Sequence, residues 1–269
     1  MRALRGDVNP VWDLGMAQLE SLVAYADELL DVSTFPDYPV ALNGLQMEGD
    51  GRPIERVVAA VDASEAVILD AVGRDADLLI AHHGLFWSGL RPITGRYHRK
   101  LRHLFESGLA VYAAHLPLDG HGELGNAALL ARAIGVQPEA PFGSYKGRAI
   151  GCRAGLETAS SPDDLAARVG EAVGGPVRLL GAGPDSVRSI GIVTGAGAGF
   201  LEEAVALGLD AVITGEAAHH NFADAHELGI HLLLAGHYAT ETFGVRALAG
   251  HLADRFRLAV DFLDHPSGL

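Results

Sequence analysis

The chain contains one strand–helix–strand pattern twice, and this repeat restricts its fold more than any other feature. Residues 57–83 hold an apolar segment, a helix-like segment and a second apolar segment, and residues 190–216 follow the same order. Asp77 precedes the second apolar segment of the first copy, and Asp210 stands at the same place in the other copy. Such internal repetition indicates two related structural units built on one plan.

Apolar strands that alternate with helices of about ten residues predict βαβ crossovers and an α/β fold. The apolar run at residues 232–235 lacks the alternation of a half-exposed strand, so we expect mainly parallel or mixed sheets covered by helices. Ser161 and Pro162 form a typical helix start. We place a first α/β lobe in residues 1–136 and a second in residues 137–269, with a metal site between them.

Composition narrows the class of protein. The chain has 269 residues, of which 49% are hydrophobic, and this is ample for a core in each of two lobes. Its formal net charge of −14 argues against binding to nucleic acid or to anionic membranes, which requires a basic surface. The single cysteine excludes an intrachain disulfide framework. Residues 1–7 lack an apolar signal core and no apolar run of about 18 residues occurs, so we expect a cytoplasmic protein.

Two apolar segments end in a histidine that is followed, four residues later, by an acid. The pairs are His115 with Asp119 and His237 with Glu241, and one offset along the chain relates both pairs. An imidazole and a carboxylate placed in this way can face one space and hold a metal ion. Either acid could instead serve a helix start, as an N-cap or as a complement to the helix dipole. We prefer metal binding because the acid recurs in both copies.

A third apolar segment ends in the adjacent histidines His82 and His83. Neighbouring residues of a strand point in different directions, so each ring could reach a different ion, which favours a dinuclear centre. Imidazole and carboxylate ligands without a thiolate suit zinc, manganese, iron or cobalt better than calcium or magnesium. We therefore expect two divalent metal ions per chain, of an identity that the ligand types do not fix.

The sequence leaves two further residues with open roles. By analogy with His237, His115 could bind metal, but it could equally orient Asp119 or donate to a substrate. Glu216 takes the place of His83 in the repeat, and it fits either a group that supports the ligands or a general base. Ligands of parallel sheets gather at the carboxyl ends of the strands. The candidates expected at these ends are His82, His83, His115, Asp119, Glu216, His237 and Glu241.

A basic run follows the histidine pair in this otherwise acidic chain. Residues 91–103 contain five of the chain's 20 lysines and arginines. Arg96, Arg99 and Lys100 are candidates for binding a phosphate or another anion. A solvated helix face explains the run equally well.

Several segments in combination resemble the signature segments of the NIF-three-like family, whose members are often described as homologues of type-two GTP cyclohydrolase. The similarity spans about residues 16–265. The segments that carry it are residues 81–84, 115–119 and 236–241, together with residues 43–46 and the glycine-rich turn at 195–199. We assign no role to residues 43–46 from their chemistry alone.

The resemblance implies two intertwined homologous lobes, assembled as a hexameric toroid with metal sites that face an interior cavity. It assigns two divalent ions to His82, His83, Asp119, His237 and Glu241. The activity it implies is metal-dependent hydrolysis of a nucleotide-like or phosphorylated substrate, such as opening of the imidazole ring of GTP, with the basic run holding the phosphates. The alternative is a non-catalytic metal-binding ring that acts as a scaffold or a regulatory protein.

Overall fold

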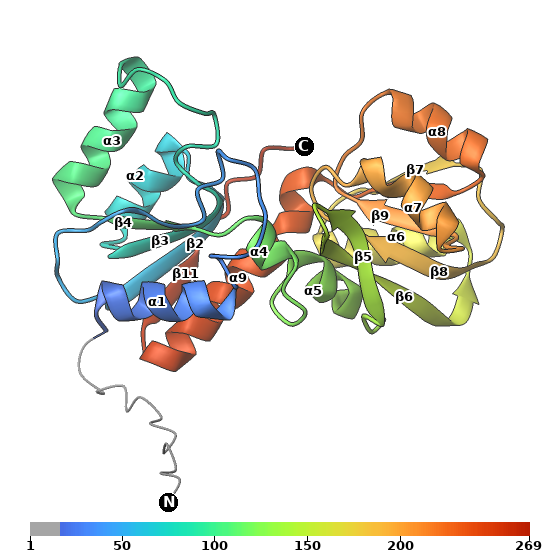
Figure 1. Cartoon of the computed structure of the whole chain (residues 1–269), viewed down its shortest axis with the longest axis horizontal. Helices are drawn as coiled ribbons and strands as arrows, with labels where there is room; N and C mark the ends of the chain where they lie inside the picture. Colours follow the sequence, from blue (N-terminus) through green and yellow to red (C-terminus); the bar gives the residue numbers. More distant parts are fainter. Residues whose placement is uncertain (1–16) are drawn as a thin grey trace, which may run out of the picture.

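Two β-sheets covered by helices organise residues 17–269, the part of the chain that the computed structural model describes (Figure 1). One sheet has five strands in the order β1-β4-β3-β2-β11, and the other has six in the order β5-β6-β8-β9-β10-β7. Each sheet forms a lobe with its helices, and the short helix α4 (Leu116–Asp119) lies at the junction of the lobes. The expected α/β fold with two sheets is confirmed.

The first sheet is mixed. Its parallel strands are β2 (Arg56–Asp62), β3 (Leu78–His83), β4 (Ala110–Ala113) and β11 (Ala259–Phe262), and the antiparallel edge strand is β1 (Gly44–Met47). One face of this sheet packs against α1 (Leu19–Leu29) and α9 (His237–Phe256), and the other against α2 (Glu65–Gly73) and α3 (Gly95–Ser107). Apolar side chains therefore fill both faces.

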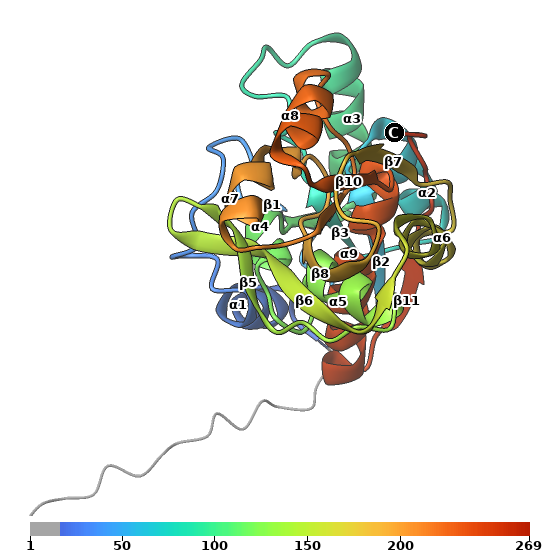
Figure 2. The ribbon, with the colours of Figure 1, turned by 90° about the vertical axis from the view of Figure 1, so that its right-hand side faces the viewer.

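The second sheet has a parallel centre and antiparallel edges. Its parallel strands are β8 (Val187–Ile192), β9 (Ala211–Thr214) and β10 (His231–Leu234), and its antiparallel strands are β5 (Ala140–Tyr145), β6 (Arg148–Ser160) and β7 (Arg178–Gly181). Helices α5 (Asn126–Ala133) and α6 (Pro162–Val173) cover one face. The 3-10 turn η1 (Ala198–Phe200), α7 (Leu201–Ala206) and α8 (His220–Leu228) cover the other face, and Figure 2 shows α6 and α7 on opposite sides.

Local sequence explains several of these elements. All residues of β3 and β9 are buried, as near-continuous apolar strands covered on both faces must be. Ser161 caps α6 by accepting a hydrogen bond from the N–H of Asp164 at 3.1 Å, and Pro162 occupies the first turn, where its missing N–H costs nothing. The helix start predicted there is confirmed.

The two copies of the repeat share a specific contact. Asp77 accepts hydrogen bonds from the consecutive backbone N–H groups of Glu55 and Arg56, each at 2.9 Å, where β2 begins. Asp210 accepts the corresponding pair from two consecutive N–H groups of β8, at 2.8 and 2.9 Å. A carboxylate that ties one parallel strand to the next therefore recurs in both lobes, which supports an internal duplication.

The chain crosses between the lobes, so the lobes are intertwined. Helix α9 follows β10 of the second sheet, yet Val245, Leu248 and Leu252 pack in the core of the first lobe. Strand β11 then pairs in parallel with β2. In the other direction, α5 of the first half packs on the second sheet. Each of the ranges 1–136 and 137–269 therefore contributes elements to both lobes, and the division at residue 136 stays a prediction.

The structure tests the expectation that the chain has no membrane-spanning helix. Among the described residues, every helix is too short or too polar to cross a lipid bilayer. Residues 1–7, on which the expected absence of a signal peptide rests, lie outside the described part of the chain. The cytoplasmic location therefore stays a prediction.

We expect Asp77→Ala to lower the free energy of unfolding by about 2 kcal/mol, because it leaves two N–H groups at the start of β2 without an acceptor. Burial opposes ionisation of this carboxyl, but the two N–H groups and Arg52 hold its pKa below the usual range. Because the folded pKa is the lower one, this stabilisation is present above about pH 3.9 and is lost as the pH falls through the folded pKa.

Denaturant unfolding at pH 7 and under acid conditions measures both effects. Asp254→Ala, at an exposed position of α9, is the control and should change stability by less than about 0.5 kcal/mol. Equal stability of the Asp77→Ala variant and the unaltered protein at pH 7 would contradict the role of Asp77 as a tie between strands.

Candidate metal centre

The sequence-predicted metal ligands meet at the carboxyl ends of strands from both lobes. His82 and His83 end β3, and His115 lies two residues beyond β4. His237 is the first residue of α9, shortly after β10, and Glu241 lies one turn further along the same helix. The helix carries its acid back across the junction to the histidines of the first lobe, which is why distant segments share one site.

The carboxylate of Glu241 lies at the centre of the cluster. Its Oε1 is 3.5 Å from Nε2 of His82, and its Oε2 is 3.5 Å from Nε2 of His83 and 3.1 Å from Nε2 of His237. Asp119 approaches from α4, with its Oδ2 3.6 Å from Nε2 of His82. Glu241 thus approaches three of the predicted ligands, and Asp119 joins the cluster through His82.

Two groups of potential ligand atoms are close enough to hold metal ions. Within each group, the ligand atoms lie within 4.8 Å of one another. The first group consists of His82, His83 and His115, and the second of His83, His237 and Glu241. His83 belongs to both groups, so the two groups adjoin at this residue.

Each of the four imidazole rings is fixed in the orientation that a metal ligand needs. In every case Nδ1 donates a hydrogen bond to an acceptor on another segment of the chain, so Nε2 is the ring atom left to bind a metal ion. The acceptors are the carbonyl of Ala114 for His82, Asp62 for His83 and Asp37 for His115, each at 2.9 Å, and Glu216 for His237 at 3.0 Å.

Two buried atoms of the cluster have no hydrogen-bond partner among the described residues, Nε2 of His82 and Oε2 of Glu241. A buried polar atom without a partner costs free energy, and native structures contain few of them. Both atoms are lone-pair donors of types that divalent transition metals prefer. These atoms belong one to each ligand group, and cations bound there would satisfy both, so the residues present fit metal ions.

The electrostatics of the cluster favour positive charge. Burial lowers the pKa of His82, but the carboxylates of Asp119 and Glu241 outweigh it and raise that pKa to about 10. Burial likewise opposes charge on His237, whereas Glu241 and Glu216 raise its pKa to about 9. The pKa of Glu241 lies well below its usual range despite complete burial, because the histidines favour its charged form. A divalent cation supplies the positive charge that these carboxylates demand.

The sequence did not reveal the acids that hold two of the rings. Asp62 ends β2 and lies directly across from His83 in the strand register, so its position at a strand end is a signal that could have identified it. Asp37 lies in a connecting segment with no strand-end pattern, and its contact with His115 spans most of the first lobe's sequence. Only the folded chain brings these two residues together.

The segment at residues 43–46, which had no assigned role, supports the site. Asn43 donates to Asp37 at 2.8 Å and accepts the backbone N–H of His115 at 2.7 Å. The Gln46 side chain accepts the backbone N–H of Leu85 at 2.7 Å, just beyond the histidine pair. These bonds position the backbone on both sides of the cluster.

Asn126 is a second supporting residue that the sequence did not indicate. It is fully buried, and its Nδ2 donates to Asp119 at 2.7 Å. Its Oδ1 accepts the backbone N–H of Gly244 on α9 at 2.6 Å. One amide thus orients the candidate ligand Asp119 and ties it to the helix that carries Glu241.

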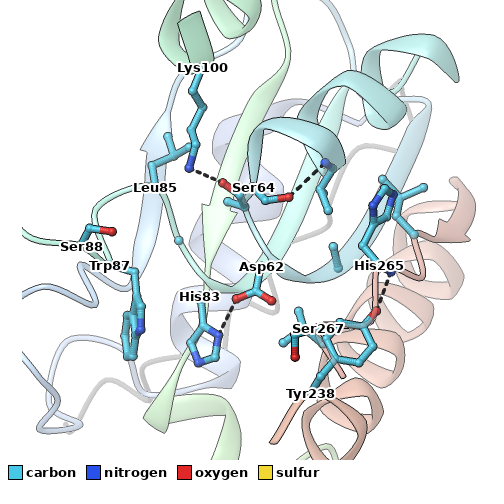
Figure 3. A pocket seen from close by; sticks show the side chains of 16 residues that line it. Asp62, Ser64, His83, Leu85, Trp87, Ser88, Lys100, Tyr238, His265 and Ser267 are labelled. Carbon is cyan, nitrogen blue, oxygen red and sulfur yellow. Dashed lines mark hydrogen bonds and ion pairs between the residues drawn. The ribbon is translucent and has the colours of Figure 1, made fainter. Parts of the chain in front are cut away.

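A cavity of about 370 Å³ opens beside the cluster, and His83 forms part of its wall. Figure 3 shows His83 and Trp87 toward one end of this cavity and Lys100 toward the other. The indole of Trp87 covers the histidines, with its ring centre 4.6 Å from that of His83 and 4.5 Å from that of His115. A molecule in the cavity would touch the candidate metal centre directly.

The three predicted phosphate-binding residues have different surroundings. Arg99 forms a two-pronged ion pair with Glu65, at 2.9 and 3.1 Å, and does not line the cavities beside the site. Lys100 donates to the carbonyl of Ala63 at 2.7 Å and lines the cavity. Arg96 lines a neighbouring cavity.

Comparison with known proteins agrees with this arrangement. A family model described as Duf34/NIF3 (NGG1p interacting factor 3) matches residues 17–267. The chain belongs to this family. The similarity to the NIF-three-like family that the signature segments indicated is therefore confirmed.

Relatives in this family match the chain over nearly its whole length. A Deinococcus radiodurans protein named GTP cyclohydrolase 1 type 2 homolog is 39% identical over 264 residues, which cover 97% of this chain and 99% of the relative. A Halobacterium salinarum protein of the same name is 44% identical over 246 residues, with 90% and 96% covered. The crystal structure of TTHA1606 from Thermus thermophilus, 41% identical, matches with a TM-score of 0.85 and covers 94% of this chain and 100% of that one.

We expect Glu241→Gln to weaken binding of zinc or manganese by at least about a hundredfold, because the neutral amide supplies neither the charge nor the second donor oxygen that the three rings face. Equilibrium dialysis against metal buffers measures the affinity. Glu157→Gln, at an exposed position of β6, removes one carboxylate elsewhere and should leave affinity unchanged. The same loss in both variants would show that general charge, and not the cluster, controls metal uptake.

Proposed function

We propose that this chain binds two divalent metal ions and uses them to hydrolyse a nucleotide-like or phosphorylated substrate, in a reaction of the GTP cyclohydrolase type. The observation that carries the proposal is the pair of ligand groups that share His83, beside a cavity of about 370 Å³. The names of the relatives, GTP cyclohydrolase 1 type 2 homolog, point in the same direction.

The ligand set supports two ions and not one. His82 and His83 are neighbours in β3, with ring centres 4.9 Å apart and planes at 51°, and only His83 also belongs to the group of His237 and Glu241. Glu241 offers one oxygen toward His82 and the other toward His83 and His237, which is how a bridging carboxylate serves two ions. When bound, two such ions lower the pKa of a shared water and polarise the substrate.

The surrounding residues supply the remaining functions. Asp37 holds Nδ1 of His115, so Nε2 of that ring is free either to bind an ion or to accept a proton from the attacking water. Glu216 is occupied in orienting His237, which favours a supporting role over that of a general base. Trp87 covers His83 and His115 and limits the access of bulk water to them.

The stoichiometry of metal is the first test. The protein purified without a histidine tag or chelator should contain about two divalent ions per chain, as dinuclear hydrolytic sites do. The double variant His82→Ala, His237→Ala should contain none, because it removes a ring from each ligand group. Elemental analysis of both proteins measures this, and an unaltered protein that neither contains nor takes up metal would sink the hydrolase proposal.

Loss of His237 separates an enzyme from a metal-stabilised scaffold. For an enzyme, His237→Ala should reduce hydrolysis of GTP by at least about a hundredfold, with the oligomer and the melting temperature nearly unchanged. His237 is partly exposed at the edge of the cluster, so its removal opens no core cavity. Absorbance of the guanine ring follows the reaction, light scattering follows assembly, and His220→Ala, at an exposed histidine of α8, is the control.

Dissociation of the oligomer in His237→Ala, without any measurable turnover by the unaltered protein, would favour the scaffold instead. The homo-oligomer itself, a hexamer by family resemblance, is part of this proposal, and the same light-scattering experiment determines its size.

A further inference from the structure

A second cavity extends the space beside the metal centre. It has a volume of about 320 Å³, and it shares the lining residues Ser64, Leu85, Ser88 and Lys100 with the cavity that His83 borders. Both volumes fall in the range of small-molecule sites. A ligand longer than one cavity can therefore continue past Lys100 into the other.

Basic side chains concentrate at the distal end of this combined space. Arg91, Arg96 and Lys100 line the second cavity, and its one acidic lining residue, Glu65, is already paired with Arg99. Arg96 and Lys100 lie four residues apart on α3, so they occupy the same face of the helix. Three cationic groups are thus directed to one space that contains no free carboxylate.

These cations lack anionic partners within the described part of the chain. Arg91 donates Nη2 to the carbonyl of Ser88, while its buried Nε has no hydrogen-bond partner. Lys100 donates only to the carbonyl of Ala63, and Arg96 forms no hydrogen bond or ion pair with any described residue. The buried, unpartnered Nε of Arg91 indicates a missing acceptor, and the exposed Arg96 leaves its guanidinium available to the same ligand.

Mutual repulsion supports the same conclusion. Burial lowers the pKa of Lys100 and the nearby charge of Arg96 lowers it further, against the opposing charges of Glu65 and Asp62. Cations that are close enough to repel one another are stabilised by an anion that enters between them. A phosphoryl group offers the three strong acceptor oxygens that guanidinium and ammonium donors match.

We propose that Arg91, Arg96 and Lys100 bind a phosphoryl group of the substrate, and that this group is a handle and not the site of hydrolysis. Arg91 and Arg96 line only the second cavity, whereas His83 and Trp87 line only the first. The phosphoryl group therefore lies apart from the metal centre, where another part of the molecule is placed. The inference rests on the proposed hydrolase function and narrows its substrate to an organic phosphate that is attacked at carbon.

Binding of GTP and of guanosine to the metal-loaded protein tests the site by titration calorimetry. Arg96→Gln and the double variant Arg91→Gln, Arg96→Gln should weaken GTP binding by about ten- to a hundredfold, and leave guanosine binding and metal content unchanged. Arg102→Gln is the matched control: it removes a charge from the same helix, but Arg102 is paired with Glu106 and lines neither cavity. This control should bind GTP as the unaltered protein does.

Equal GTP affinity of Arg96→Gln and the unaltered protein would overturn the inference, as would the absence of any binding of GTP or inorganic phosphate to the metal-loaded protein. Turnover that releases inorganic phosphate in proportion to substrate consumed would overturn it too, since the handle must stay on the product. GTP binding that depends on Arg96, in a protein without any turnover, would instead support the phosphoryl site while the hydrolase proposal fails.

Discussion

The structure depends on the burial of one carboxylate, that of Glu241. It is 3% exposed, and a buried charge is tolerated only when opposite charges or strong donors surround it. Those partners, His82 and His83, belong to the other lobe, so α9 has to leave the second sheet and cross to the first. The cluster can consequently form only if the chain crosses between the lobes. After α9, β11 pairs with β2 in the first sheet.

The hydrogen bonds behind the histidines complete this arrangement. Three rings are held by carboxylates and one by the backbone carbonyl of Ala114, so every Nδ1 has an acceptor that does not depend on a bound ion. The rings are thereby oriented before any ligand arrives, which reduces the ordering that ligand binding would require. Every Nδ1 of the cluster is therefore hydrogen-bonded. Among the described residues, the buried atoms of the cluster without a hydrogen-bond partner are Nε2 of His82 and Oε2 of Glu241.

Sequence patterns could predict those features of the fold and of the site that follow from the repeated order of strands and helices. The repeat placed Asp77 and Asp210 in equivalent positions, and the contacts of both residues agree. Contacts made by connecting segments, such as that between Asp37 and His115, carry no periodic signal, because their geometry is set by the fold of the whole lobe. The basic run shows the same limit within a helix: packing against α2 pairs Arg99 with Glu65, whereas Arg96 turns to the cavity, and spacing alone does not distinguish these outcomes.

Charge and shape together restrict what can enter the space beside the metal centre. A formal net charge of −14 repels polyanions over the surface as a whole. Only a ligand small enough to reach Arg91, Arg96 and Lys100 is attracted by their positive charges. A single organic phosphate is small enough to do this, and the wall formed by Trp87 in the first cavity favours an apolar or planar part of the molecule there. Under the phosphoryl-site proposal, a small phosphorylated molecule would be held by its phosphate at one end and would present its other end to the candidate metal centre.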